Sequence, residues 1–169
     1  MNTHDLYTNL WPDKNEQFFP NLLIQHRQQI GTSCVSTGLS LLTKEEPSNV
    51  RNQINTQDPI SWSRYLQTHG MKLAYCSTDF RRLQHYVKEL LRIDDLFTIS
   101  TYSSLSPGEI GAEPDENGWI CGSHFVVLYK STVYDTRWDT PLQLQEYPDN
   151  QRYIKRIFRI VPANHERGL

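Results

Sequence analysis

Four side chains at separate positions in the chain have the types and the order that thiol-based acyl chemistry needs. Gln28 precedes Cys34 by six residues, and His124 and Asp135 follow much later. A cysteine thiolate is a nucleophile, a histidine can act as its base, and a carboxylate can orient that histidine. The Gln28 amide and the Cys34 main-chain N–H could stabilise the oxyanion that forms. The set predicts an enzyme that attacks an acyl carbon through Cys34.

The segment that begins at Ser33 is typical of a helix. Val35, Leu39, Leu41 and Leu42 give it a mostly helical apolar face, and Ser33 or Thr32 can serve as N-cap. Cys34 would then lie at a helix N-terminus. A free thiol has a pKa of about 8.5, and a helix N-terminus together with an imidazolium neighbour lowers it, so we expect a thiolate at neutral pH.

His124 lies in an apolar segment, 119–129, that is typical of a buried strand. Lys130 and Ser131 would join it tightly to a second strand over 132–136, which contains Asp135. A tight hairpin places the end of one strand beside the start of the other, so we expect the Asp135 carboxylate within reach of His124.

The remaining elements suggest one α+β domain, with helices first and mostly strands afterwards. Residues 1–27 are mixed and aromatic-rich and should wrap the core as loop and short turns. We expect further helices over 48–55, over 61–69 and after the Ser77-Thr78-Asp79 cap, and further strands over 71–75, 96–102 and 153–161. The domain spans 1–161, and 162–169 should form a C-terminal tail.

Composition limits the classes of function. The chain has 169 residues, enough for one domain with a core of its own, and a net charge of -2. No broad positive field is available for nucleic acid or an anionic membrane, so the expected partner is a peptide or protein substrate. The first residues resemble no signal peptide, and three well-separated cysteines suit a reducing compartment, which favours a cytoplasmic protein or one exported without a cleavable signal. No cofactor is expected, and the oligomeric state stays open.

Each member of the set also has a structural explanation. A buried cysteine often acts as a small hydrophobic residue, and a histidine in a core is more often hydrogen-bonded than catalytic. Asp135 could end a strand and begin a turn. Gln28 has a rival in Gln29, and either could be a solvated loop amide. The ordered set therefore supports catalysis more strongly than any member alone.

Together these residues give the chain a resemblance to the papain-like cysteine protease superfamily, in particular to compact bacterial members such as the double-glycine leader peptidases. The residues that carry it are Gln28, Gly31, Ser33, Cys34, His124 and Asp135. The resemblance implies a helical lobe that faces an antiparallel sheet, with the active cleft between them. In papain a Trp two residues after the third triad member shields it, whereas Trp138 follows Asp135 by three and could cover the pair or fill the core.

By the same resemblance, the expected activity is hydrolysis of a peptide or isopeptide bond through a Cys34–His124–Asp135 triad, with Gln28 in the oxyanion hole. A cell-wall peptide amidase or an acyltransferase could use the same triad. Two other classes stay open: a non-catalytic binding module, and a zinc module in which Cys34, Cys76, Cys121 and His124 form a Cys3His set. The acidic segment 103–118 could favour cationic substrates or simply be a solvated loop.

Overall fold

The computed structural model describes residues 9–12, 16–79, 81–102 and 123–169. The helices are α1 (Cys34–Thr43), α2 (Pro47–Arg51), α3 (Pro59–Gln67) and α4 (Val87–Ile93), and short 3-10 helices cover Leu83–Tyr86, Leu144–Glu146 and Pro148–Gln151. The strands are β1 (Met71–Tyr75), β2 (Leu96–Tyr102), β3 (Ser123–Tyr129), β4 (Thr132–Tyr134), β5 (Leu142–Gln143) and β6 (Ile154–Pro162).

The strands form one antiparallel sheet of six, in the order β1-β6-β2-β3-β4-β5. β2 pairs with β3 along its whole length, from Leu96 opposite Tyr129 to Tyr102 opposite Ser123. Lys130 takes a left-handed φ of 56° in the tight connection from β3 to β4. The mixed α+β architecture agrees with the prediction from the sequence.

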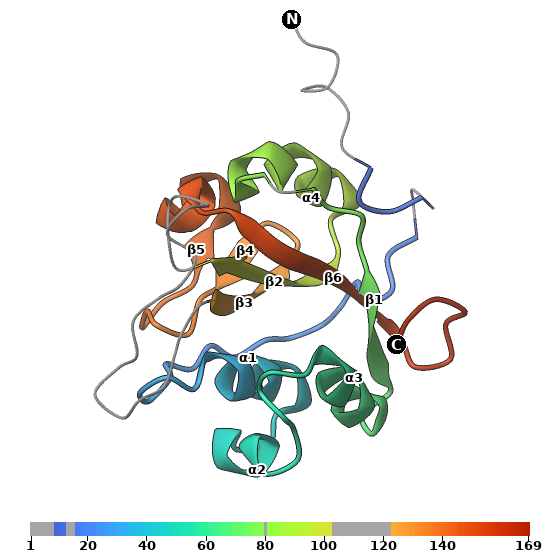
Figure 1. The fold of residues 1–169 in the computed structure, drawn as a ribbon, viewed down its shortest axis with the longest axis vertical. Helices are drawn as coiled ribbons and strands as arrows, with labels where there is room; N and C mark the ends of the chain where they lie inside the picture. Colours follow the sequence, from blue (N-terminus) through green and yellow to red (C-terminus); the bar gives the residue numbers. More distant parts are fainter. Residues whose placement is uncertain (1–8, 13–15, 80, 103–122) are drawn as a thin grey trace, which may run out of the picture.

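Helices cover both faces of the sheet (Figure 1). On one face α1 lies against β3 and α3 against β1, and on the other lie α4 and the 3-10 helix before it. Each face has a core cluster, because side chains along a strand alternate between faces. Phe125 and Val127 of β3 pack on the α1 side, whereas Val126 and Leu128 pack on the α4 side.

Close contact between α1 and β3 depends on Gly38. A Cβ atom at this position would lie 2.4 Å from Cε1 of Phe125. The absence of a side chain therefore lets the helix approach the strand that carries His124. The helix is buried on all sides from Ser36 to Leu42, and its small polar side chains bond within the helix: Ser40 donates to the carbonyl of Thr37 over 2.5 Å.

Most predicted elements occur close to their expected bounds, and one helix was predicted wrongly at its start. The Ser77-Thr78-Asp79 segment does not cap a helix; the backbone enters a 3-10 turn at Leu83 and becomes α-helical at Val87. The Asp79 carboxylate instead accepts hydrogen bonds from Tyr86 and Arg81. The two-residue strand β5 was not predicted, and segment 103–118 lies outside the described residues.

The segment after β6, predicted as a tail, is hydrogen-bonded to the domain. Ala163 N donates to Gly70 O, and Leu169 N donates to Leu73 O over 2.8 Å. The side chains of Ser63 and Gln67 donate to the main-chain oxygen of Leu169.

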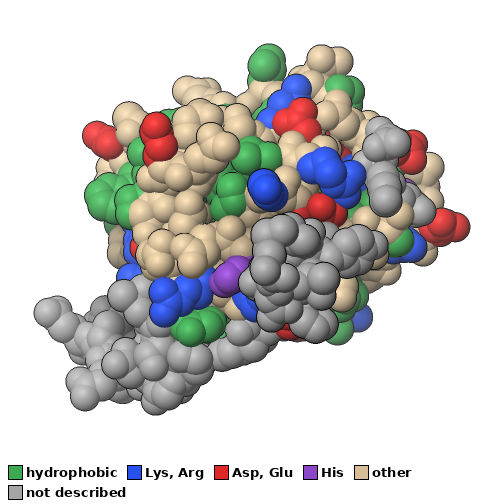
Figure 2. Space-filling model, turned by 90° about the horizontal axis from the view of Figure 1, so that it is seen from above, with side chains coloured by type: hydrophobic (Ala, Val, Ile, Leu, Met, Phe, Trp, Pro, Cys, Tyr) green, Lys and Arg blue, Asp and Glu red, His purple; other side chains and the backbone are tan. Residues whose placement is uncertain are grey.

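Charge is mixed over the face seen in Figure 2, where Lys and Arg alternate with Asp and Glu among uncharged groups. In the part of the chain that the structure describes, none of the helices has the length and apolar character needed to cross a bilayer.

Candidate active site

Three elements bring Cys34, His124 and Asp135 together. Cys34 is the first residue of α1, His124 is the second residue of β3, and Asp135 directly follows β4 on the next strand of the hairpin. All three residues are buried, with 6%, 7% and 1% of their surfaces exposed. The structure therefore assembles the three residues whose order in the sequence suggested a triad.

The Cys34 thiol lies beside His124 at the N-terminus of α1. It is hydrogen-bonded to the His124 ring and receives main-chain hydrogen bonds from Phe125 and Val35. The first bond of the helix runs from Thr37 N to Ser33 O over 2.9 Å, so the Cys34 N–H lies ahead of the helical ladder. Ser33 is the N-cap residue as predicted, but its hydroxyl donates to Ile30 O and makes no side-chain cap.

His124 connects the thiol to the carboxylate. Its Nε2 lies 2.7 Å from Oδ1 of Asp135, which leaves Nδ1 for the thiol. Burial lowers the pKa of His124, but its hydrogen bonds to Asp135 and Cys34, together with their negative charge, outweigh burial, so its pKa is raised overall. The ring is thus held in one orientation and favours the imidazolium form.

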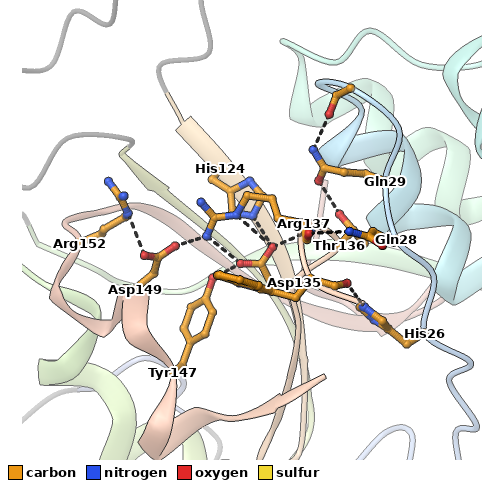
Figure 3. Close-up of polar contacts among 12 residues, drawn as sticks. His26, Gln28, Gln29, His124, Asp135, Thr136, Arg137, Tyr147, Asp149 and Arg152 are labelled. Carbon is orange, nitrogen blue, oxygen red and sulfur yellow. Dashed lines mark hydrogen bonds and ion pairs between the residues drawn. The ribbon is translucent and has the colours of Figure 1, made fainter. Parts of the chain in front are cut away.

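Asp135 accepts hydrogen bonds from three side chains, which converge on it in Figure 3. Besides His124, the Tyr147 hydroxyl donates to Oδ2 over 2.5 Å, and Nη2 of Arg137 donates to the same oxygen over 2.8 Å. Burial raises the pKa of Asp135, but hydrogen bonds from His124 and Arg137 hold it well below its usual range. The carboxylate therefore stays charged and fixed.

Arg137 links the buried carboxylate to the surface. It also pairs with Asp149, which pairs with Nε of Arg152 over 3.1 Å (Figure 3). Neither Arg137 nor Tyr147 was singled out in the sequence. The sequence gives only a weak indication of the Arg137 contact, because Arg137 lies two residues after Asp135 in a turn. It gives none for Tyr147, which is brought to Asp135 by the fold.

The two described cysteines have opposite pKa shifts at equal burial. Burial raises the pKa of Cys34, but the hydrogen bond and positive charge of His124 and the main-chain hydrogen bonds of Phe125 and Val35 together outweigh it, and the pKa falls below its ordinary value of 9.0. Cys76 is also 6% exposed, and burial raises its pKa to about 12 despite nearby Arg159. The environment of Cys34 is the one that favours a thiolate.

The structure distinguishes the two candidate glutamines. Gln28 is exposed, and its Nε2 donates to Arg137 O over 3.1 Å. Gln29 lines a cavity of about 220 Å³ together with Cys34 and His124. Its Oε1 accepts from Thr136 and its Nε2 donates to Gly31 O over 2.8 Å, which fixes the amide and leaves a second N–H (Figure 3).

A larger cavity of about 820 Å³ also borders Cys34. Cys34 lines both cavities, whereas His124 lines only the smaller one. Cys34 therefore borders two cavities, and His124 borders one of them. Trp138, which was expected to shield the pair or fill the core, is 47% exposed and does not fill the core.

Among the residues that the structure describes, no group of three or more His, Cys, Asp and Glu side chains is arranged so that it could hold a metal ion. Cys34 and Cys76 belong to different core clusters on opposite faces of the sheet. Cys121, the third cysteine of the zinc alternative, lies outside the described residues.

Comparison with known proteins assigns no family. No protein-family model matches the chain, and no curated protein matches it. The chemistry of the site must therefore be argued from its own geometry.

Proposed function

We propose that this chain is a thiol hydrolase that cleaves a peptide or isopeptide bond, with Cys34 as nucleophile, His124 as acid and base, and Asp135 as the group that orients His124. The observation that carries the proposal is the continuous hydrogen-bond chain from the Cys34 thiol through His124 to a charged Asp135, at the start of a buried helix. A cysteine with a purely structural role requires none of these groups.

In the first half of the reaction, the Cys34 thiolate attacks the acyl carbon and the carbonyl becomes a tetrahedral oxyanion. The Cys34 N–H and the free N–H of the Gln29 amide are the donors for this oxyanion. As the carbon–nitrogen bond breaks, His124 transfers its Nδ1 proton to the leaving amine. The acyl group remains on Cys34 as a thioester.

In the second half, His124 is neutral and takes a proton from water, and the resulting hydroxide attacks the thioester. The carbon–sulfur bond breaks, the acid is released and the thiolate returns with the imidazolium. Asp135 stays ionised throughout and holds the ring in place. An acyltransferase would use an amine in place of water, so the site supports both outcomes and hydrolysis is the simpler one.

We also propose a papain-like arrangement for the fold. Support comes from the proposed nucleophile at the start of a helix that packs against an antiparallel sheet, with the histidine on β3 and the carboxylate directly after the neighbouring strand β4. The agreement concerns architecture and the order of residues, and it is independent of substrate.

Alkylation by iodoacetamide tests the proposal directly. Between pH 5 and 8 we expect Cys34 to be labelled rapidly and Cys76 hardly at all, because the Cys34 pKa is lowered and the Cys76 pKa is raised to about 12. Removing the ring in His124→Ala leaves burial to raise the Cys34 pKa. Labelling at pH 6 should then fall at least about a hundredfold, since each pKa unit changes the thiolate fraction tenfold. Mass spectrometry assigns each labelled cysteine.

The matched control is His85→Ala, which removes an exposed histidine from the 3-10 helix on the other face of the sheet and should leave Cys34 labelling unchanged. Equal and slow labelling of Cys34 and Cys76 in the folded wild type would contradict the proposal and leave the cysteine a packing role. Rapid labelling of Cys34 would justify screening α-linked peptides, isopeptides and cell-wall peptides for hydrolysis.

A further inference from the structure

The larger cavity beside Cys34 is lined by positive charge. Arg51 of α2 and two consecutive residues of β6, Lys155 and Arg156, line it, and no Asp or Glu is among the described residues that do so. Trp62 forms an apolar wall, and the Arg156 guanidinium lies 5.9 Å from the centre of its ring. The whole molecule has a net charge of -2, so this local excess of cations is not a property of the general surface.

A β-bulge explains how two consecutive residues reach the same cavity. Neighbouring side chains of a regular strand point to opposite faces. Here the pairing shifts: Ser100 lies opposite Arg156 and Thr101 lies opposite Ile154, so Lys155 is an extra residue on β6. Bulges re-aim side chains in this way and are common next to active sites. The sequence alone would place Lys155 and Arg156 on opposite faces.

The cations of the two cavities differ in their partners. In the smaller cavity Arg137 pairs with Asp135 and Asp149, and Arg152 pairs with Asp149. Within the described part of the chain, Arg51, Lys155 and Arg156 form no ion pair with a carboxylate. Burial, followed by the positive charge of Arg156, lowers the pKa of Lys155, which indicates that the two like charges interact. An anion in the cavity would relieve this repulsion.

The position of His124 assigns the larger cavity to one side of the scissile bond. His124 must reach the leaving amine to protonate it, and it lines only the smaller cavity. The leaving group therefore lies in the smaller cavity. The larger cavity receives the acyl part of the substrate, which stays bonded to Cys34 as the thioester.

We propose that the substrate carries a carboxylate on its acyl side and that Arg51, Lys155 and Arg156 bind this carboxylate in the larger cavity. The inference rests on the proposed function and narrows its substrate class. Two kinds of substrate offer such a group: an α-linked peptide with an Asp or Glu side chain near the scissile bond, and an isopeptide whose acyl residue keeps a free α-carboxylate.

Peptide chloromethyl ketones, which occupy the acyl side and alkylate the thiol, test this preference without turnover. We would compare acetyl-Xaa-Ala and acetyl-Ala-Xaa reagents in which Xaa is Glu, Gln or Lys. Each rate of Cys34 alkylation is divided by the rate at which iodoacetamide alkylates Cys34 in the same protein variant. Because a carboxylate would form charge-assisted hydrogen bonds in the cavity, we expect a Glu reagent to react about tenfold faster than its Gln counterpart. Its advantage over the Lys reagent should be larger still. The preference should shrink as salt concentration rises.

The double variant Lys155→Gln, Arg156→Gln should abolish the Glu preference. Arg64→Gln, which removes an exposed cation of α3 that does not line the cavity, should retain it. A chloromethyl ketone built on the side-chain carboxyl of acetyl-Glu, with its α-carboxylate free or amidated, separates the two sources. For this reagent we compare the Cys34 rate with a free α-carboxylate to the rate with an amidated one. If this rate ratio exceeds the Glu-to-Gln rate ratio of the α-linked reagents, the isopeptide is the source of the carboxylate.

Equal rates for Glu and Gln, or a preference for Lys, would overturn the inference even when iodoacetamide labels Cys34 rapidly. If iodoacetamide labels Cys34 no faster than Cys76, the proposed function fails instead. The cavity is then tested by NMR titration of Cys34→Ala with acetyl-Glu-Ala-amide and acetyl-Gln-Ala-amide. Stronger binding of the Glu peptide, with a shift of the Trp62 indole signal, would support the carboxylate site, and equal binding would reject it.

Discussion

Neighbouring groups, and not burial, decide the ionisation of the Cys34 thiol. Cys76 is equally buried, and the rise of its pKa from 9.0 to about 12 corresponds to roughly 4 kcal/mol against the thiolate. Desolvation opposes the Cys34 thiolate in the same direction, yet the pKa of Cys34 is lowered, because His124 bonds it and carries positive charge. Two equally buried cysteines of one protein thus have opposite pKa shifts, and Cys76 is an internal control for any labelling of Cys34.

The two adjacent glutamines allow the oxyanion donor to be tested. Gln29→Glu keeps the shape of the side chain and an oxygen for Thr136 but removes the N–H groups. We expect kcat for hydrolysis of p-nitrophenyl acetate to fall about 10²- to 10³-fold, as it does when one oxyanion donor is lost. Gln28→Glu is the matched control and should change kcat by less than about threefold. A larger fall in kcat for Gln28→Glu than for Gln29→Glu would instead assign the oxyanion donor to Gln28.

At the residue level, the sequence predicted which residues would meet, but not the contacts of their neighbours. The order of Cys34, His124 and Asp135 was sufficient to predict that they would meet. Spacing favoured Gln28, but its amide donates to Arg137 O, whereas Gln29 lines the smaller cavity with Cys34 and His124. Tyr147 reaches Asp135 from a short 3-10 segment, and no local pattern in the sequence marks that contact.

At the level of elements, the site depends on the distance between α1 and β3. Gly38 sets this distance, because the Phe125 ring occupies the space that a Cβ would need. Phe125 follows His124 on β3 and also lines the larger cavity. A change in helix packing would therefore move the wall of the larger cavity and His124 together.

Gly38→Ala tests this packing. Helix propensity favours alanine by about 1 kcal/mol, but a Cβ 2.4 Å from the buried Phe125 ring creates overpacking that typically costs about 1–3 kcal/mol. We expect a net loss of unfolding free energy in urea, together with slower iodoacetamide labelling of Cys34. In Gly38→Ala, Phe125→Leu the two losses should be clearly less than additive, because the smaller side chain makes room. Strict additivity would show that the ring is not the obstacle.

Residue types predicted two of the strands. β1 and β2 have the predicted bounds, since both consist mainly of apolar, aromatic and β-branched residues, which favour strands. The start of α4 was wrong because Asp79 bonds with Tyr86 and Arg81, contacts that depend on the folded turn. The bulge in β6 could not be predicted, since its register is set by pairing with β2.

Across the whole molecule, a buried ion pair anchors the N-terminal segment that leads to the site. Arg159 and Asp95 are 0% and 1% exposed, and Nη2 of Arg159 lies 2.7 Å from Oδ2 of Asp95. Asp95 also accepts from Phe18 N and Phe19 N, and the Arg159 guanidinium lies 4.5 Å from the centre of the Phe18 ring. The chain continues to Gln29, whose N–H donates to Thr136 O over 2.7 Å, so the anchor and the cavity share one segment.

Asp95→Asn should therefore affect both stability and the site. It leaves the Arg159 charge buried without its carboxylate, and breaking a buried pair from one side costs about 3–5 kcal/mol. The matched control is Asp94→Asn, since Asp94 is the adjacent residue, has a left-handed φ of 56° that asparagine tolerates, and makes a solvent-exposed contact with Gln17. We expect the control to change the unfolding free energy in urea by less than about 0.5 kcal/mol.

Limited proteolysis of Asp95→Asn should also cut the segment 16–29 sooner than in wild type, because its anchor is lost while the sheet remains. Equal stability and equal proteolysis of the two variants would mean that packing of Trp11 and Phe18 alone holds the segment, and that the geometry around Gln29 is independent of the ion pair.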